Sequence, residues 1–235
     1  MSNPARIFLN NCLKFRQNFF GTDCLLCGAH SGSENICPAC LAHLPYLQGN
    51  RCRICANPAA GPLCGICLAK PPHFSRTLAV FSYDFPIDAL IQSLKYRENL
   101  ALSSTFAQML VQASNSYPRP DFIVPAPLHP VRLRERGFNQ ATEIARNVSR
   151  KTGIALKECS KIRDTPSQTS LPWAERKKNV RDAFSCDFAL KSVHVAIIDD
   201  VMTTGSTLDE LAKILLREGA REVSAWVVAR AVKSV

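Results

Sequence analysis

Two acidic residues and a run of hydroxyl residues follow one another in the last quarter of the chain. The acids are Asp199 and Asp200, and the run that follows is Thr203, Thr204, Gly205, Ser206 and Thr207. Hydroxyl groups and the backbone N–H groups of a helix start donate hydrogen bonds to an anion, and Gly205 has no side chain to hold a phosphate away. Because two carboxylates would repel a bare phosphate, the ligand must also carry groups that need acceptors. A phosphorylated ribose with a divalent cation beside it meets both requirements.

The sequence on either side of this run predicts the elements that hold it. Residues 195–198 are apolar and short enough for a strand buried on both faces, and the acids follow where that strand should emerge. The residues after the run have helical periodicity, with a helix-start signature in Ser206 and Asp209 or in Thr207 and Glu210. A plainer interpretation, a buried strand that ends in turn-capping aspartates, explains one Asp and one Thr but not the whole order.

The cysteines are the second group with evident chemistry. Eight of the eleven lie in Cys-x-x-Cys pairs, namely Cys24/Cys27, Cys37/Cys40, Cys52/Cys55 and Cys64/Cys67. Each pair can aim two thiolates at one point, and two pairs complete a tetrahedral zinc site. The short intervals predict two successive structural Zn²⁺ sites, one from the first two pairs and one from the last two. Crossed pairing, in which the first pair shares a metal with the third, stays open on spacing alone.

Disulfides are the alternative use of these thiols, and a reducing cytoplasm disfavours them. We expect residues 1–20 to form a short N-terminal helix rather than a secretory signal, since no long apolar run occurs there. Residues 21–70 carry little apolar mass, so metal binding would supply the folding energy of a double zinc ribbon. The remaining cysteines, Cys12, Cys159 and Cys186, belong to no Cys-x-x-Cys pair, and we interpret them as core fillers or bystanders.

Basic residues gather in three places. Arg134 and Arg136 lie in an expected loop after the strand at residues 121–124, where they could take a pyrophosphate or belong to a solvated basic loop. Arg176 and Lys177 lie in residues 168–181, which we interpret as a flap over a polyanion or as a solvated helix. The basic residues at 95–97 end an expected helix, where they favour its dipole or reach a phosphate.

The rest of the chain alternates strands with helices. Further strands are expected at 77–83, 121–124 and 223–229, and helices at 86–94, 102–113 and 141–153. Alternation of this kind predicts an α/β fold with an open, mostly parallel sheet over residues 73–235. Ligands of such sheets sit at the carboxyl ends of the strands, where both the acidic stretch and the arginines should lie.

Composition limits the class of protein without naming its ligand. The chain has 235 residues, is 46% hydrophobic and 20% charged, and carries a formal net charge of +10. These values indicate a folded protein with an affinity for polyanions, either nucleic acid or a polyphosphorylated small molecule. No apolar run approaches the ~18 residues of a membrane span.

Residues 195–207 resemble, at every position, the phosphoribosyl pyrophosphate (PRPP) signature of type I phosphoribosyltransferases. The resemblance implies that Asp199 and Asp200 hold the ribose diol and that the hydroxyl run from Thr203 to Thr207 holds the phosphate. It also implies Mg²⁺ as the companion of PRPP. Arg134, Arg136, Arg176 and Lys177 would then stabilise the departing pyrophosphate.

The chain as a whole is similar to the ComF family. The resemblance rests on the four Cys-x-x-Cys pairs, Leu-Lys-Tyr-Arg at 94–97, Pro-Ala-Pro-Leu-His-Pro at 125–130, Arg-Glu-Arg-Gly-Phe-Asn-Gln-Ala at 134–141, the segment 168–180 and the acidic stretch. It implies a double zinc ribbon followed by a type I phosphoribosyltransferase domain. It further implies a cytoplasmic protein of natural competence that handles incoming single-stranded DNA.

The sequence is compatible with three functions of different classes. The first is an enzyme that transfers phosphoribosyl from PRPP to an unknown acceptor. The second is a single-stranded-DNA-binding protein that uses the PRPP site as a sensor, which the charge of +10 favours and the few aromatic residues near the basic segments disfavour. The third is an adaptor whose zinc ribbons dock a competence-machinery protein.

Overall fold

The computed structural model describes residues 22–96, 99–163 and 183–232. The expected helix at residues 1–20 and the expected flap, with Arg176 and Lys177, lie outside these ranges, and so do Arg97 and Cys12. The chain divides into two compact units, Met1–Leu44 and Pro45–Val235. The boundary falls between the two groups of cysteine pairs, so the second group belongs to the same unit as the sheet.

The first unit is small and is built around its cysteines. An antiparallel bridge joins Asp23 to His30 and forms a turn around the first cysteine pair. Helix α2 (Pro38–Ala42) begins after Cys37, whose side chain accepts a hydrogen bond from the N–H of Cys40. Ile36 is the buried residue beside them, with 1% of its surface exposed. Among the described residues of this unit, Ile36 and Leu44 are the buried apolar side chains besides cysteines, in agreement with a fold that depends on its cysteines.

A parallel sheet forms the centre of the second unit. Its strands are β1 (Arg76–Ser82), β2 (Phe122–Pro125), β3 (Ala155–Leu156), β6 (His194–Met202) and β7 (Glu222–Arg230). The order across the sheet is β1-β7-β6-β2-β3, and every pairing in it is parallel. The expected α/β fold with an open, mostly parallel sheet is therefore confirmed.

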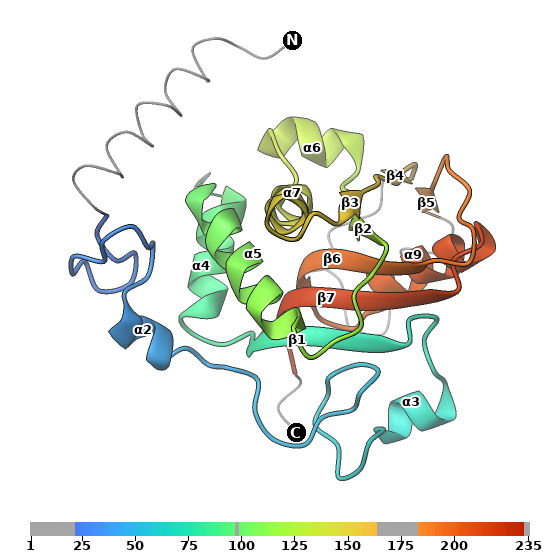
Figure 1. Cartoon of the computed structure of the whole chain (residues 1–235), viewed down its shortest axis with the longest axis horizontal. Helices are drawn as coiled ribbons and strands as arrows, with labels where there is room; N and C mark the ends of the chain where they lie inside the picture. The colour runs from blue at the N-terminus through green and yellow to red at the C-terminus, as the bar shows by residue number, and fades with distance from the viewer. Residues whose placement is uncertain (1–21, 97–98, 164–182, 233–235) are drawn as a thin grey trace. The chain divides into compact units, whose positions relative to one another are not determined.

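Helices cover both faces of this sheet. On one face α5 (Ala101–Ser114) packs on β1 and β7, and α7 (Gln140–Thr152) packs on β2 and β6. On the other face α9 (Ser206–Arg217) packs on β6 and β7, behind the strands in Figure 1. Helix α4 (Ile87–Tyr96) packs beside α5. Because both faces are covered, β6 and β7 are almost wholly buried and most of their residues are apolar, as is usual for parallel strands.

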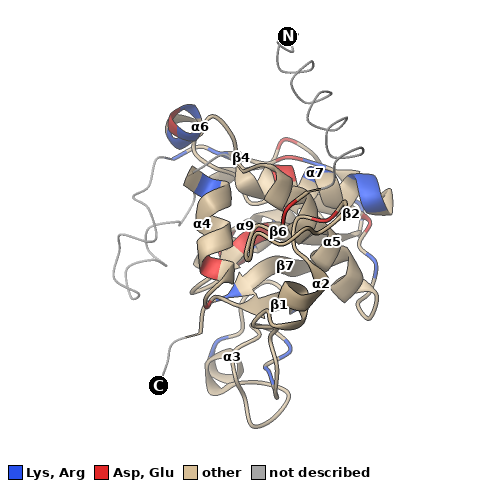
Figure 2. Ribbon diagram, turned by 90° about the vertical axis from the view of Figure 1, so that its left-hand side faces the viewer, with Lys and Arg blue, Asp and Glu red and all other residues tan. Residues whose placement is uncertain are grey.

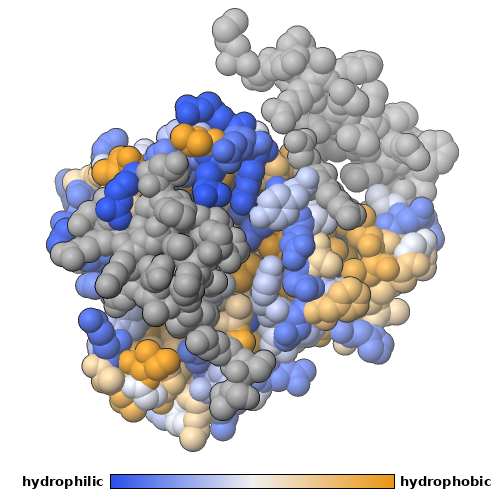
Figure 3. Space-filling view, turned by 180° about the vertical axis from the view of Figure 1, so that it is seen from behind, coloured by the Kyte–Doolittle hydropathy of each residue, from blue (hydrophilic) through white to orange (hydrophobic). Residues whose placement is uncertain are grey.

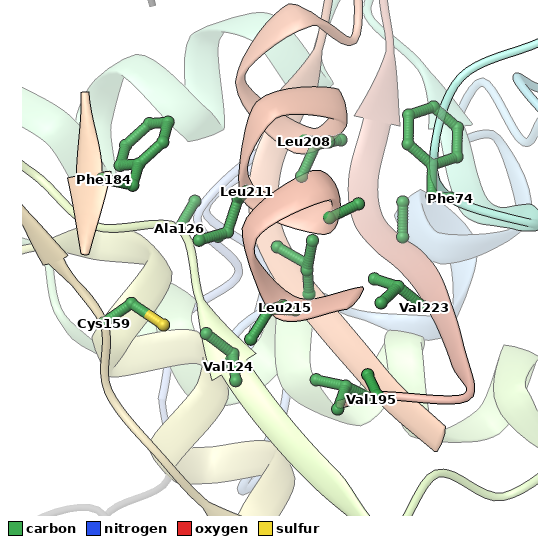
Figure 4. Close-up of a cluster of buried hydrophobic side chains, with 14 of the residues drawn as sticks. Phe74, Val124, Ala126, Cys159, Phe184, Val195, Leu208, Leu211, Leu215 and Val223 are labelled. Carbon is green, nitrogen blue, oxygen red and sulfur yellow. The ribbon is translucent and has the colours of Figure 1, made fainter. Parts of the chain in front are cut away.

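The core under α9 fixes where the residues before that helix lie. Leu208, Leu211 and Leu215 recur on one side of α9 and are buried against Val195 and Val223 of the strands (Figure 4). Burial of a leucine side chain contributes about 2 kcal/mol each. This packing anchors the strand, the hydroxyl run and the helix as one rigid unit.

A short antiparallel pair lies at the edge of the second unit. It consists of β4 (Ser160–Lys161) and β5 (Phe184–Ser185). Immediately outside this pair, Cys159 and Cys186 form a disulfide with Cα atoms 4.4 Å apart. The sequence did not predict this disulfide, because the pairing of β4 with β5 is what brings these two distant cysteines together. Both are buried in the core, as was expected.

Candidate functional site

The acidic pair lies inside strand β6 rather than after it. The ladder between β6 and β7 continues through Asp199 and Val201 to Met202. Asp199 is half-buried, whereas Asp200 has only 4% of its surface exposed. The carboxylate of Asp200 lies 2.6 Å from the ammonium group of Lys95, at the last turn of α4. The strand thus holds one carboxylate in a buried ion pair and the other at the edge of the site.

Burial opposes the ionisation of both acids, and their neighbours decide the outcome. Burial and the adjacent charge of Asp200 raise the pKa of Asp199 well above its usual value of 3.8. Burial alone would also raise the pKa of Asp200, but the Lys95 ammonium brings it below the usual value. Conversely, burial would lower the pKa of Lys95, and Asp200 holds it above its usual value. Asp200 and Lys95 are therefore both charged, and Asp199 gains most from a ligand that donates to it.

The hydroxyl run forms a tight turn between β6 and α9. Gly205 adopts the left-handed conformation, with φ of 79°, and α9 begins at the next residue. A Cβ atom at this position would lie 2.7 Å from Cε of Met202, so glycine is required both by backbone conformation and by space. Thr204 Oγ1 lies 2.8 Å from Ser206 Oγ and accepts a hydrogen bond from the N–H of Ser206 at 3.2 Å. We call residues 203–207 the phosphate loop.

Helix α9 begins at Ser206, where the sequence predicts a helix start, but its N-cap residue is a glycine. Gly205 is the N-cap of α9 and makes no side-chain cap. The carboxylate of Asp209, which could have completed a capping box, instead accepts hydrogen bonds from the N–H of His73 at 2.8 Å and pairs with its Nδ1 at 2.7 Å. Because Gly205 has no side chain, the N–H groups of the first turn of α9 receive no side-chain cap from the N-cap residue, although the N–H of Ser206 donates to Thr204 Oγ1.

A hollow brings Asp199 and most of the phosphate loop together, whereas Asp200 and Thr204 do not line it. Its lining comes from the end of β6 and the start of α9, with Asp199, Thr203, Gly205, Ser206 and Thr207 among its residues. Acceptors and donors therefore face one space, with a carboxylate at one end and the start of a helix at the other. This arrangement suits a ligand that has hydroxyl groups at one end and a phosphate at the other.

The arginines expected in a loop lie on a short helix, α6 (Pro130–Arg136). The expected loop is wrong here, since the sequence has both a start and a stop signal. His129 is the N-cap with Pro130 in the first turn, and Gly137 ends the helix with φ of 75°. Arg134 and Arg136 lie in its last turn, where cations favour the helix dipole. Much of the α6 ribbon is blue in Figure 2, in keeping with the three arginines of this helix.

The end of α4 joins α6 to the acidic pair. Lys95 contacts Asp200, and the ring of the next residue, Tyr96, lies under the guanidinium of Arg136, 5.2 Å from its centroid. Arg136 also donates to the amide oxygen of Gln140 at 3.4 Å. Arg134 is exposed. Helix α6 lies at the top of the molecule in Figure 1, and hydrophilic residues are frequent at the top of the surface in Figure 3. The structure thus brings Arg136 near the acidic pair through two consecutive residues of α4.

Lys95 is a site residue that the sequence did not identify. Its position at a helix end favoured an interaction with the helix dipole, and such an interaction requires no carboxylate partner. The structure instead gives it a buried carboxylate from β6. The acidic pair itself could have indicated such a lysine, because a carboxylate in a buried strand needs a cation beside it.

The eight paired cysteines form two clusters of four. Cys24, Cys27, Cys37 and Cys40 make the first and Cys52, Cys55, Cys64 and Cys67 the second, with the four sulfur atoms of each within 4.8 Å of one another. The successive arrangement is therefore present and the crossed one is not. The sulfur atoms of Cys27 and Cys37 lie 3.8 Å apart, and those of Cys55 and Cys64 lie 3.6 Å apart.

These distances fit zinc. Four thiolates at ~2.3 Å from a tetrahedral Zn²⁺ have sulfur atoms about 3.8 Å apart. Burial opposes the ionisation of Cys24, but hydrogen bonds from N–H groups lower its pKa to about 6, and the same balance lowers that of Cys52 to about 6. Hydrogen bonds from the neighbouring thiols raise the pKa of Cys40 to about 12. A divalent cation removes the repulsion that keeps such thiols protonated.

In the part of the chain that the structure describes, no helix is both long and apolar enough to cross a membrane.

Comparison with known proteins gives matches over nearly the whole chain. Residues 16–69 match the double zinc ribbon domain family. The DNA utilization protein YhgH of Salmonella typhi is 35% identical over 205 residues, which cover 83% of this chain and 90% of that protein. Competence protein F of Haemophilus influenzae is 30% identical over 232 residues, covering 91% of this chain and 99% of that protein. Competence protein ComFC of Bacillus subtilis is 28% identical over 212 residues, covering 84% and 85%.

Solved structures with a similar arrangement include two phosphoribosyltransferases. A purine phosphoribosyltransferase from Pyrococcus horikoshii is 17% identical, with a TM-score of 0.33 over 67% of this chain and 91% of that one. An adenine phosphoribosyltransferase from Thermoanaerobacter pseudethanolicus is 15% identical, with a TM-score of 0.37 over 58% of this chain and 83% of that one.

Proposed function

The chain belongs to the ComF family, and on that premise we propose that it binds PRPP at the hollow between β6 and α9 and acts in the uptake or use of DNA. Relatives carry the names of competence and DNA utilization proteins. The observation that carries the proposal is the meeting of Asp199 and the phosphate loop in one hollow. A ribose phosphate offers hydroxyl groups to the carboxylate and oxygen atoms to the N–H groups of α9.

Each part of PRPP has a chemically suitable neighbour. The phosphate would lie on the N–H groups of residues 204–207, where the helix dipole favours negative charge. The ribose hydroxyls would donate to Asp199, whose raised pKa shows that its negative charge needs compensation. The pyrophosphate would extend toward α6, where Arg136 and Arg134 lie. Arg176 and Lys177 lie outside the described residues, and we propose that they add positive charge against the departing pyrophosphate.

The reaction we propose is a transfer at the anomeric carbon. The bond from this carbon to the pyrophosphate oxygen breaks, and its electron pair leaves with the pyrophosphate. A nitrogen nucleophile then bonds to the carbon and releases a proton. Arginine side chains on α6 would stabilise the charge on the leaving group, and the phosphate loop would hold the ribose in place.

Mg²⁺ would accompany PRPP at this site. The carboxylate of Asp199 and the ribose hydroxyls offer the oxygen ligands that Mg²⁺ prefers. When bound, Mg²⁺ supplies positive charge against the departing pyrophosphate. The pairing of Asp200 with Lys95 leaves Asp199 as the carboxylate that faces the hollow.

A second candidate is a single-stranded-DNA-binding protein that uses PRPP as a signal rather than a substrate. The net charge of +10 and the arginines of α6 favour it, because basic surfaces attract a phosphate backbone. In this version the zinc ribbons dock a competence-machinery protein. The two candidates share the PRPP site and differ in whether PRPP is consumed.

Calorimetry with PRPP, with and without Mg²⁺, tests the shared site. We compare the wild type with Asp199→Asn and with Asp187→Asn, an exposed aspartate beside β5 that serves as the control. The wild type and the control should bind PRPP, and Asp199→Asn should bind at least about 10-fold more weakly, as the loss of one charged hydrogen bond predicts. Equal affinity for all three proteins would contradict the proposed site.

Two further measurements separate the candidates. A screen of nucleobases and amines for release of pyrophosphate from PRPP supports the enzyme if any acceptor accelerates release. A salt titration of single-stranded DNA affinity supports the second candidate if Arg134→Ala reduces the salt slope by about 1 and Arg150→Ala, an exposed arginine on α7, does not.

A further inference from the structure

A buried arginine at the end of β7 touches both the second cysteine cluster and the phosphate loop. Arg230 has 2% of its surface exposed. Its Nε donates to the carbonyl of Cys55 at 2.8 Å, and one Nη donates to the amide oxygen of Asn57 at 2.7 Å. Both acceptors belong to the tight turn that carries the first cysteine pair of the second cluster.

The other Nη of Arg230 reaches the phosphate loop. It donates to the carbonyl of Met202 at 2.9 Å and also to those of Thr203 and Ala231. Arg230 therefore fixes the backbone at the point where β6 passes into the loop. A guanidinium can do this because its donors point in fixed directions, and a lysine ammonium has no such fork.

A second line of contacts runs beside the first. Thr77 Oγ1 donates to the carbonyl of Ile54 in the same turn, at 2.5 Å, and lies 3.8 Å from the sulfur of Met202. The terminal methyl of Met202 packs under Gly205, at the place that a Cβ atom there would occupy. Thr77 thus contacts both the turn and Met202, the residue that packs against Gly205 of the phosphate loop.

A cavity of about 300 Å³ lies beside these contacts. Its walls include Cys55, Asn57 and Cys67 from the second cluster and Met202, Gly205 and Ser206 from the loop. The second cluster and the phosphate loop are therefore neighbours, since residues of both line this cavity.

The turn that presents these acceptors is shaped by its cysteines. The N–H of Cys52 donates to the carbonyl of Asn57 at 2.8 Å, and the N–H of Ala56 donates to the carbonyl of Cys52 at 2.8 Å. A metal held by Cys52 and Cys55 would lock this turn, because both side chains would be bound at one point. Without it, the thiols repel or turn away, and the carbonyls that Arg230 needs lose their fixed positions.

We propose that Arg230 is a positioning residue that makes the order of the phosphate loop depend on the metal in the second cluster. Occupancy of that cluster fixes the turn at residues 52–57, the turn fixes Arg230, and Arg230 fixes the loop at Met202 and Thr203. Because such coupling is reciprocal, a ligand on the loop also strengthens the hold on the metal. The statement about a loop ligand rests on the proposed PRPP site, whereas the statement about loop order does not.

Hydrogen exchange in the full-length, zinc-loaded protein tests the coupling without any ligand. Asn57→Ala removes one acceptor of Arg230 from the ribbon side, Asn57→Asp restores an acceptor, and Asn50→Ala is the matched control from the same segment. We expect Asn57→Ala to increase exchange of the amides at residues 203–208 by about 5-fold or more, with little change in α5 and α7. Asn57→Asp and Asn50→Ala should exchange like the wild type.

The same experiment has clear adverse outcomes. Unchanged exchange of residues 203–208 in Asn57→Ala would overturn the proposal. An equal increase in α5 and α7 would also overturn it, because the side chain would then support the whole unit and not the loop. Removal of zinc from the first cluster alone, by Cys27→Ser with Cys40→Ser, should leave exchange of the loop unchanged.

Zinc release to a colour-forming chelator tests the reciprocal effect. PRPP with Mg²⁺ should slow release from the second cluster by about 5-fold or more in the wild type and should have little effect in Asn57→Ala. Equal slowing in both proteins would contradict a route through Arg230. If PRPP does not bind at all, the proposed function fails, and the exchange experiment still decides the role of Arg230.

Discussion

Lys95 and Asp200 show how much a single buried pair can constrain a site. The two charged groups lie 2.6 Å apart, and their side chains are 16% and 6% exposed. A pair of this kind adds little net stability compared with apolar residues, but either partner alone is costly because a buried charge is left uncompensated. The pair therefore fixes the end of α4 against β6 more than it stabilises the fold.

The first prediction concerns this pair. Lys95→Met should lower the free energy of unfolding by about 3 kcal/mol, because Asp200 then remains buried without its cation. The double variant Lys95→Met with Asp200→Asn should recover most of that loss, since the charge is removed along with its partner. Urea unfolding of Lys95→Met, Asp200→Asn and the double variant measures the coupling free energy between the two side chains. A double variant as unstable as the single one would contradict this account.

The second prediction concerns pH. The hydroxyl of Ser75 donates to Glu222 at 2.6 Å and lowers the pKa of that carboxyl below its usual value of 4.5, although partial burial opposes the effect. The folded state therefore gains stability above this value and loses it as the pH falls through the lowered pKa. Glu222→Gln should make the unfolding free energy fall less between neutral and acid pH than in the wild type. An identical fall in both proteins, measured by urea unfolding across this range, would contradict the assigned cause.

At the scale of elements, the local sequence predicts the positions of β6, the phosphate loop and α9 better than those of other elements. The buried strand, the glycine turn and the helix with its leucine stripe all lie close to their expected positions, because each depends on neighbouring residues. Helix α6 was missed although Pro130 and Gly137 mark its ends, because a run of arginines has no apolar periodicity to indicate a helix.

The third prediction concerns Gly205. Gly205→Ala combines an unfavourable φ with a contact of 2.7 Å to Met202, whereas Gly153→Ala at the end of α7 has a φ of 71° and nothing within 4 Å. Both variants should lose about 1 kcal/mol from backbone strain, and Gly205→Ala should lose more. Only Gly205→Ala should weaken PRPP binding, because it moves the N–H groups that hold the phosphate. Calorimetry and thermal unfolding of both variants check this difference, and a matched loss of binding in Gly153→Ala would refute it.

At the scale of the whole molecule, contacts between distant residues are what the sequence could not supply. The disulfide of Cys159 with Cys186, the contact of His73 with Asp209 and four of the five acceptors of Arg230 join residues far apart in the chain. No local pattern selects such partners. The Cys-x-x-Cys pairs were different, since four cysteines at short spacing leave few ways to complete a metal site.

The fourth prediction follows from the two clusters. The purified protein should contain two Zn²⁺ per chain, one in each set of four cysteines. Cys27→Ser with Cys40→Ser should reduce the content to one, and Cys55→Ser with Cys67→Ser should do the same. Elemental analysis of the three proteins measures this. Complete loss of zinc from either variant would contradict two independent sites.

The order of the sheet has a consequence for synthesis of the chain on the ribosome. Strand β7 is the last to be made, yet it pairs with β1 on one side and with β6 on the other. Until β7 emerges from the exit tunnel, β1 has no neighbour in the sheet. Arg230, the last residue of β7, is also still absent from the folded part of the chain. A nascent chain that stalls just before this strand would expose two unpaired strand edges to chaperones and to aggregation.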